Sequence, residues 1–202
     1  MGVILMQHLQ LPNPQYTPNF ISGWNIEDSQ LCDQLVDFFE TNQAMQIKGK
    51  TSSGIDPNSK RSTDIIIKPK MLLEPEFKIF ESYMAKLHLC YMDYKKQWPF
   101  LEKMPNLEIG KFNLQKYRTG DHFNSVHTER ASINTTHRVL AWMTYLNDVE
   151  EGGETSFSHF GLSIRPEKGK TLIWPADWSH AHSGHSVTQG LKYIITGWIQ
   201  FV

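Results

Sequence analysis

The chain has 202 residues, a length typical of one domain with its own hydrophobic core. Its 20 Lys and Arg nearly balance its 21 Asp and Glu, so the net charge gives no reason to expect binding to nucleic acid or to a membrane surface. The two cysteines, Cys32 and Cys90, form no CxxC pair, and we expect free thiols in a reducing compartment.

The N-terminal stretch MGVILMQHLQLPNP lacks the charged start and the small-residue cleavage site of a signal peptide. Met6 stands where the myristoylation pattern has Ser or Thr. No apolar run approaches the roughly 18 residues of a membrane span. These features predict a cytoplasmic protein.

Two segments in the first half have helical periodicity. Residues 26–40 follow Asn25, which we expect to be the N-cap, and place apolar side chains on one face. Residues 76–94 follow Pro75, which suits a first helical turn, and repeat apolar side chains at steps of three and four. The apolar positions are Leu31, Leu35, Phe38 and Phe39 in the first helix, and Phe77, Phe80, Met84, Leu87, Tyr91 and Tyr94 in the second.

Between these helices, KGKTSSGIDPNSKRSTD is polar and turn-rich, which predicts a loop. This loop, at residues 49–64, is either a plain surface loop or a lid over a site. The run IIIKP that follows predicts a short strand ended by Pro69.

The second half contains short apolar runs separated by turn signals: LEIGKFNLQKY, RVLAWMTYLN, TSFSHFGLSIRP, GKTLIWP and LKYIITGWIQFV. This spacing is typical of an all-β sandwich or barrel. Helices followed by many strands indicate helices packed on one face of a β core. We therefore expect a single domain over residues 1–202, with a helix-rich support region at about 1–105 and a β core at about 106–202.

The stretch SVHTER holds His127 and Glu129, which point to the same side if residues 123–129 are extended. The later stretch WSHAHSGHSV offers further histidines: His180, His182 and His185. Two histidines and one carboxylate with open coordination positions form the facial triad of non-haem Fe(II) oxygenases. Two polar residues on a solvated strand face are the alternative.

In the last predicted strand, alternation puts Lys192, Ile194, Thr196 and Trp198 on one face. A lysine aimed at an interior needs an anionic partner, because an unpaired buried ammonium is costly. A bound carboxylate would serve. The alternative is an edge-strand lysine that blocks aggregation.

Three ordered motifs over about residues 108–202 resemble prolyl-4-hydroxylase-like, Fe(II)- and 2-oxoglutarate-dependent dioxygenases. YRTGDHFNSVHTER is similar to their Y-x-x-G-x-x-F/Y-x-x-H-x-D segment, MTYLNDVEEGGETSF to their strand and Gly-Gly turn, and HSGHSVTQGLKYIITGW to their H-x4-V-x2-G-x-K ending. The resemblance implies an α+β fold with a double-stranded β-helix (jelly-roll, cupin-like) core and N-terminal helices packed on one face.

The resemblance also implies a role for each matching residue. Iron would be held by His127, Glu129 and His182. His180 competes with His182 for the last position, because the two would share a face in an extended segment. His185 would point the other way. Lys192 would pair with the distal carboxylate of 2-oxoglutarate. The other matching positions are Tyr117 and Tyr145 near that cosubstrate, Thr155 and Trp198 in the pocket wall, and Arg138, which would contact the prime substrate or be a surface strand arginine.

The implied activity couples oxidative decarboxylation of 2-oxoglutarate to succinate with hydroxylation of a C–H bond. It uses Fe(II), 2-oxoglutarate and O2, with ascorbate as a reductant, and the prime substrate is a peptide or a small molecule. Nucleic-acid and membrane partners are not expected. Glu129 departs from the family's usual Asp by one methylene and one torsion, which alters the metal geometry or weakens the site. Two alternatives follow: a catalytically silent jelly-roll binding module and a zinc-dependent hydrolase.

Overall fold

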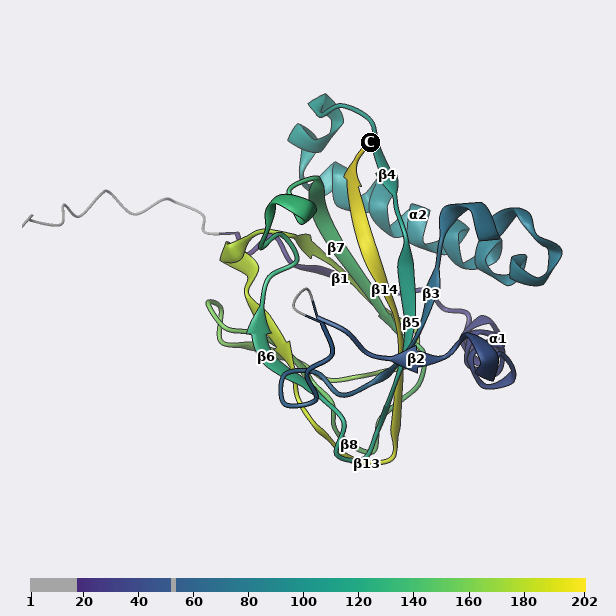
Figure 1. Cartoon of the computed structure of the whole chain (residues 1–202). Helices are drawn as coiled ribbons and strands as arrows, with labels where there is room; N and C mark the ends of the chain where they lie inside the picture. The colour runs from purple at the N-terminus through teal and green to yellow at the C-terminus, as the bar shows by residue number, and fades with distance from the viewer. Residues whose placement is uncertain (1–17, 52–53) are drawn as a thin grey trace, which may run out of the picture.

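The computed structural model describes residues 18–51 and 54–202 (Figure 1). The predictions on a signal peptide and on myristoylation concern residues 1–17, outside the described residues. Across the described ranges, none of the helices is long and apolar enough to cross a membrane.

The larger of two main sheets has eight strands in the order β1-β11-β7-β14-β5-β3-β2, with β4 also paired to β14. Neighbouring strands are antiparallel. The longest strand, β14, lies between β5 and β7, so it is a central strand. The bounds are β1 Ser22–Asn25, β2 Ile47–Lys48, β3 Thr63–Ile67, β4 Leu107–Ile109, β5 Phe112–Arg118, β7 Arg138–Tyr145, β11 Lys170–Pro175 and β14 Leu191–Phe201.

The smaller sheet has four strands in the order β10-β9-β12-β6, and a separate pair joins β13 to β8. Between the two main sheets lies an apolar cluster that includes Met143, Phe157, Trp174 and Ile194. Two facing antiparallel sheets form the predicted double-stranded β-helix. The bounds are β6 Phe123–His127, β8 Glu151–Gly152, β9 Thr155–Phe157, β10 Leu162–Ile164, β12 His182–Gly184 and β13 Val187–Gln189.

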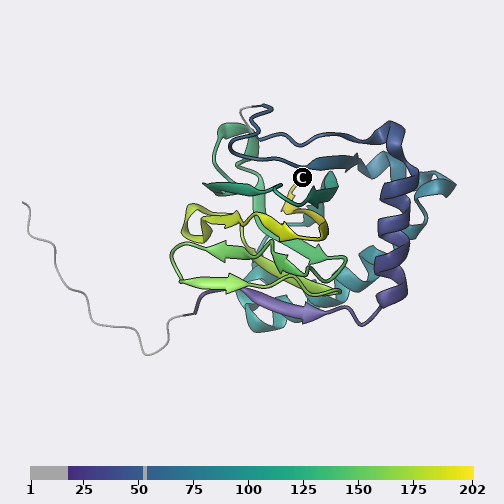
Figure 2. The same cartoon turned by 90° about the horizontal axis from the view of Figure 1, so that it is seen from below.

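Two helices, α1 (Ser29–Thr41) and α2 (Ile79–Gln97), pack on the face of the larger sheet that points away from β6 (Figures 1 and 2). Alternation along β7 explains the two cores, because Trp142 joins the helix-side cluster while Met143 joins the inter-sheet cluster. The Tyr83 hydroxyl on α2 lies 2.7 Å from that of Thr144 on β7, which ties the helix to the sheet. The predicted α+β arrangement is therefore confirmed.

The helix boundaries differ from those predicted. Asp28, not Asn25, caps α1, because the Asp28 carboxylate accepts from the Leu31 N–H at 3.0 Å while Asn25 pairs with Lys170 at the end of β1. Pro75 begins a separate 3-10 turn, and α2 starts only at Ile79.

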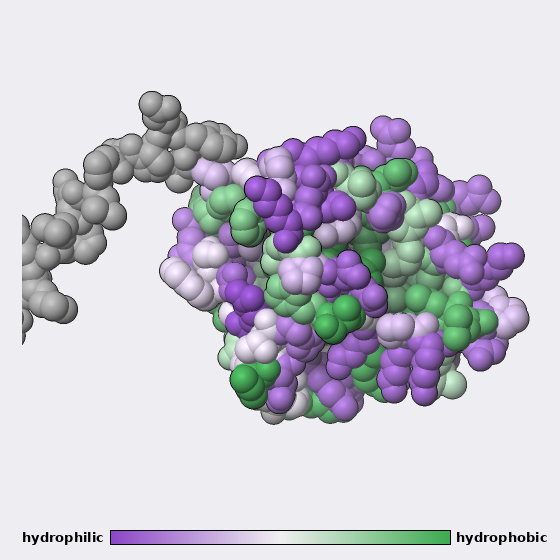
Figure 3. Space-filling model, turned by 90° about the horizontal axis from the view of Figure 1, so that it is seen from above, coloured by the Kyte–Doolittle hydropathy of each residue, from purple (hydrophilic) through white to green (hydrophobic). Residues whose placement is uncertain are grey.

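The first half also contributes β1 and β2 to the larger sheet, which the helical patterns did not predict. The remaining elements are short 3-10 helices at Gln43–Met45, Pro69–Leu73, Pro75–Phe77, Pro99–Lys103, Ile133–Thr135 and Trp178–His180. On the face shown in Figure 3, hydrophilic side chains are interspersed with hydrophobic ones.

Candidate metal centre and cosubstrate pocket

Two strands of the smaller sheet bring His127, Glu129 and His182 together. His127 ends β6, His182 begins β12, and the two residues are direct partners in the antiparallel register. Glu129 follows two residues after β6, so the predicted extension of the strand through residue 129 is wrong. The three side chains nevertheless converge, with one ligand atom from each within 4.8 Å of the others.

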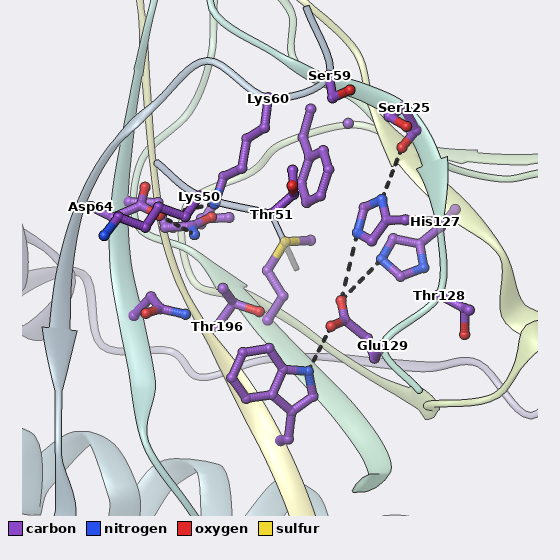
Figure 4. A pocket seen from close by; sticks show the side chains of 18 of the residues that line it. Lys50, Thr51, Ser59, Lys60, Asp64, Ser125, His127, Thr128, Glu129 and Thr196 are labelled. Carbon is purple, nitrogen blue, oxygen red and sulfur yellow. Dashed lines mark hydrogen bonds and ion pairs between the residues drawn. The ribbon is translucent and has the colours of Figure 1, made fainter. Parts of the chain in front are cut away.

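Glu129 presents one oxygen to both imidazoles. Its Oε1 lies 3.4 Å from His182 Nε2 and 3.7 Å from His127 Nε2. Figure 4 shows the Glu129 carboxylate directed toward His127, with His127 in turn directed toward Ser125. The arrangement is a small triangle of nitrogen and oxygen atoms that faces the pocket.

The outer nitrogen of each histidine is held by the backbone. His127 Nδ1 donates to the Ser125 carbonyl at 2.9 Å, and His182 Nδ1 donates to the His180 carbonyl at 2.9 Å. Since a carbonyl only accepts, both Nδ1 atoms carry a proton, and each imidazole presents its Nε2 atom toward Glu129. Metal-bound histidines are oriented by this kind of outer contact. The donor set therefore fits a divalent cation.

The charge of Glu129 also suits a metal ligand. Burial raises the pKa of this carboxyl group, but its contacts with His127 and His182 outweigh burial and hold the pKa well below the ordinary value. The carboxylate is therefore ionised at neutral pH, as metal binding requires. Its second oxygen, Oε2, accepts a hydrogen bond from Trp198 Nε1 at 2.7 Å.

Aromatic rings restrict the two imidazoles. Phe123 stacks on His127 with ring centroids 3.7 Å apart and planes 12° apart. Trp174 and Phe157 contact His182 at centroid distances of 5.2 and 5.6 Å. Packing thus restricts rotation of both rings, whose Nε2 atoms face Glu129.

The other two histidines of the cluster lie elsewhere. We expected His180 to share the face of His182 in an extended segment. Residues 178–180 instead form a 3-10 turn, so the two side chains lie on different faces. His180 instead lies 2.7 Å from the Asn19 carbonyl through Nε2 and 2.9 Å from Ser179 Oγ through Nδ1. His185 points away as expected, with Nε2 2.8 Å from Ser156 Oγ.

Lys192 lies in the same pocket, which has a volume of about 870 Å³. Its side chain is almost fully buried, and Nζ donates to the Gly153 carbonyl at 2.7 Å. Burial lowers the pKa of Lys192 to about 8, and Glu154 offsets this only in part. Because β14 is central, the edge-strand explanation of this lysine is wrong. A buried ammonium of this kind is suited to binding an anion.

Two tyrosine rings lie beside Lys192. Its Nζ lies 5.2 Å from the centroid of the Tyr117 ring and 5.4 Å from that of Tyr145. The Tyr145 hydroxyl donates to Thr155 Oγ1 at 2.7 Å, which leaves the Thr155 proton available to a ligand, since Thr155 lines the pocket. The Tyr117 hydroxyl donates to Gln115 Oε1 at 2.8 Å. The structure thus brings Tyr117, Tyr145 and Thr155, three of the other four predicted cosubstrate positions, close to Lys192, and their roles in binding the cosubstrate stay predictions.

A buried polar network beside Tyr117 was not predicted. Asp64 accepts from Lys60 at 2.9 Å, from Ser62 at 2.7 Å and from Gln115 at 3.0 Å. A charged residue within the apolar run of β3 was the available signal, but the predicted strand began two residues too late. The loop that supplies Lys60 also lines the pocket through Lys50, Thr51, Asp56 and Ser59; its role as a lid stays a prediction.

Arg138 is not a surface strand arginine. Its Nη1 donates to the Glu129 carbonyl at 2.9 Å and lies 3.5 Å from Glu129 Oε2. Its guanidinium carbon lies 3.5 Å from the centroid of the Trp198 ring. The predicted contact of Arg138 with a prime substrate stays a prediction, and so does the role of Trp198 as a cosubstrate wall.

Two histidines, a carboxylate and a buried lysine in one pocket of a double-stranded β-helix are the residue types that a mononuclear Fe(II) oxygenase of the jelly-roll fold requires. Residues 112–200 match the family model of the 2OG-Fe(II) oxygenase superfamily. This part of the chain is similar to that superfamily, and it resembles prolyl 4-hydroxylases within it.

Curated relatives match over part of their length. The chain is 28% identical over 123 residues to "Probable prolyl 4-hydroxylase 9" of Arabidopsis thaliana, an alignment that covers 48% of this chain and 43% of that protein. The chain thus spans less than half the length of this relative.

Solved structures share the fold over most of the chain. A viral collagen prolyl hydroxylase from Paramecium bursaria Chlorella virus-1, solved as a 2OG complex, superposes with a TM-score of 0.67 at 19% identity, covering 91% of this chain and 97% of that one. A prolyl hydroxylase from Trichoplax adhaerens, solved with a hypoxia inducible factor peptide fragment, gives a TM-score of 0.69 at 15% identity, covering 90% and 84%. The predicted fold is confirmed by these likenesses.

Proposed function

We propose that the protein is an Fe(II)- and 2-oxoglutarate-dependent dioxygenase that hydroxylates a C–H bond of a peptide. The observation that carries this proposal is the pairing, in one pocket, of three converging lone-pair donors with a buried lysine that is paired to no carboxylate among the described residues. The first group suits Fe(II), and the second suits the distal carboxylate of 2-oxoglutarate.

Each residue has a distinct task in this proposal. His127, Glu129 and His182 would hold the iron, which when bound supplies the redox chemistry that converts 2-oxoglutarate and O2 to succinate and CO2 and oxidises the substrate C–H bond. Lys192 binds and orients the cosubstrate carboxylate, and the Thr155 hydroxyl donates a second hydrogen bond. The apolar walls formed by Met143 and Ile194 exclude water from the reacting atoms.

The size and the rim of the pocket support a peptide as prime substrate. A cavity of about 870 Å³ leaves ample space beyond a cosubstrate of about ten non-hydrogen atoms. The lining continues outward to Ile47, Ile66 and Asn134, and Val126 beside His127 is 59% exposed. Apolar groups at an open mouth suit an extended chain better than a small polar metabolite. We infer a peptidyl proline, since the named relatives are prolyl hydroxylases.

The test is turnover of the purified protein with Fe(II), 2-oxoglutarate, ascorbate and O2. We expect succinate and a mass gain of one oxygen atom on proline-containing peptides, with little gain on free proline. His182→Ala should abolish turnover, while His185→Ala, a nearby histidine outside the pocket, should retain it. Tight 2-oxoglutarate binding without succinate would favour the silent binding module. Hydrolysis with Zn(II) that is indifferent to O2 would favour the hydrolase.

We also propose a cytoplasmic location and a single domain over the whole chain. Support for the location comes from Cys32 and Cys90, which are buried free thiols. Burial raises the pKa of each thiol to about 11, so neither is poised to react. Fractionation of the source cells would test the location, and limited proteolysis would test the domain assignment.

A further inference from the structure

We propose that Trp198 and Arg138 form a clamp that adapts the longer side chain of Glu129 to bind the metal through one oxygen. The inference rests on the proposed metal centre and concerns how that centre tolerates glutamate. In this proposal both residues are positioning residues, because they act on the metal through Glu129.

Glutamate poses a specific difficulty at this position. Compared with aspartate it has one more rotatable bond, so its carboxylate samples more orientations and loses more entropy when fixed. A free carboxylate can also turn both oxygens toward one cation. A site that is to keep coordination positions open therefore needs something that holds the second oxygen away from the metal.

The structure divides the two oxygens of Glu129 between different partners. Oε1 faces Nε2 of His182 and of His127, at 3.4 and 3.7 Å. Oε2 accepts from Trp198 Nε1 at 2.7 Å and lies 3.5 Å from Arg138 Nη1. The hydrogen bond from Trp198 and the positive charge of Arg138 engage Oε2, which leaves Oε1 as the oxygen that faces the metal position.

The clamp also fixes the backbone of Glu129. Arg138 Nη1 donates to the Glu129 carbonyl at 2.9 Å, just beyond the end of β6, where strand pairing no longer restrains the chain. Carbonyl and carboxylate of one residue are thus both in contact with one guanidinium.

The two clamp residues stand on a rigid base. Arg138 begins β7 and Trp198 lies on β14, and these strands pair along their length. The guanidinium carbon lies 3.5 Å from the centroid of the Trp198 ring, a close cation–π contact. The Arg138 Nε is buried and has no hydrogen-bond partner among the described residues, so in this position the guanidinium leaves one of its N–H donors without a hydrogen bond. That unmet donor indicates a position set by Glu129 and Trp198 together.

A consequence distinguishes this clamp from general packing. Aspartate at residue 129 is too short to reach both the Trp198 indole and the metal position from the same backbone. We therefore expect Glu129→Asp, although it restores the family's usual residue, to bind metal more weakly than the natural chain.

The experiment measures Mn(II) binding to the metal-free full chain by calorimetry and by electron paramagnetic resonance. Trp198→Phe keeps the ring but removes the donor, and we expect a loss of affinity of about tenfold, as for other partners of metal ligands. In a Glu129→Ala background the same change should cost no further affinity. Trp178→Phe, at an exposed tryptophan outside the pocket, is the matched control and should bind Mn(II) normally.

Two further readouts separate positioning from folding. Thermal unfolding and circular dichroism should show Trp198→Phe folded, and the Co(II) electronic spectrum of this variant should change because the carboxylate geometry changes. Equal Mn(II) affinity of Trp198→Phe and the natural chain, or the same loss in the Glu129→Ala background, would overturn the clamp. His182→Ala and Glu129→Ala test the proposed centre separately, since both must bind Mn(II) more weakly than the natural chain whether or not the clamp exists.

Discussion

Replacing Lys192 by Met tests whether a buried charge is kept at the expense of stability. Methionine has a similar length and no charge, so the change removes the ammonium with little loss of packing. The pKa of Lys192 is lowered from 10.5 to about 8 by burial. Since one pKa unit corresponds to about 1.4 kcal/mol, burial disfavours the charged form by about 3 kcal/mol relative to the unfolded chain.

The sign of the effect depends on pH. Below pH 8 the lysine is charged in both the folded and the unfolded state, so the folded protein bears the full penalty. Between pH 8 and 10.5 the folded state releases its proton while the unfolded state keeps it, and the stability of the natural chain rises with pH. At pH 7 the loss of the hydrogen bond to Gly153, about 1 kcal/mol, offsets part of the gain from Lys192→Met. We expect the variant to be about 2 kcal/mol more stable at pH 7.

The assay is urea unfolding of both proteins at pH 7 and at pH 9.5, because the comparison cancels other groups that titrate in this range. The stability advantage of Lys192→Met should shrink or reverse at the higher pH. A 2-oxo acid that lacks the distal carboxylate, such as 2-oxobutanoate, is the ligand control. The variant should bind it as well as the natural chain does, but should lose 2-oxoglutarate. A pH-independent difference in stability, or a variant destabilised by several kcal/mol at pH 7, would refute the reasoning.

Three further predictions concern the support of the pocket. Asp64→Asn leaves the buried Lys60 ammonium without its counter-ion and should lower the free energy of unfolding by about 3–5 kcal/mol; a loss below about 1 kcal/mol in urea unfolding would contradict the ion pair's role. Gly152→Ala should lower the free energy of unfolding by more than about 1 kcal/mol in the same assay, because the backbone of Gly152 has a φ of +79° and the added Cβ would lie 2.3 Å from the Ser186 carbonyl oxygen. An unchanged unfolding midpoint would show that this turn relaxes freely. Tyr83→Phe removes a buried hydroxyl contact between α2 and β7 and should lower the free energy of unfolding by about 1 kcal/mol. Thermal unfolding of the variant should remain cooperative, and an unchanged free energy would mean that the hydroxyl pair makes no net contribution.

Much of the fold could be predicted from local sequence patterns. The 3.6-residue period found both helices because Leu31, Leu35 and Phe80 lie on faces that the larger sheet buries. The two-residue alternation of a strand put Lys192 and Trp198 on one face of β14, and both side chains line the pocket. The start of α1 was wrong because two good capping residues compete there, and the pairing of β1 with β11 decides between them.

Such local patterns could not predict contacts between residues that are distant in sequence. Asp64 and Gln115 meet only because β3 pairs with β5, and a two-residue strand such as β2 exists only through its partner. The contact of Arg138 with Glu129 likewise depends on the fold of the turn after β6. Motifs could identify the candidate metal ligands in order along the chain, but not the groups that orient them.

The charges of the pocket indicate why its two ligands belong together. Glu129 and Lys192 carry one charge each, of opposite sign, but each lies among its own partners, and no contact between them neutralises either. A divalent cation leaves the His–Glu centre with one excess positive charge, and 2-oxoglutarate brings two negative charges, one toward the metal and one toward Lys192. Metal, cosubstrate, Glu129 and Lys192 would together carry no net charge, beside the one positive charge of Arg138, whereas either ligand alone would leave two unbalanced charges on this set of groups, which is costly. Since each ligand would lower the electrostatic cost of the other, their binding would be coupled, and the coupling would be reciprocal. In the proposed centre, occupancy of the pocket by 2-oxoglutarate would therefore depend on the metal that Glu129 would help to hold.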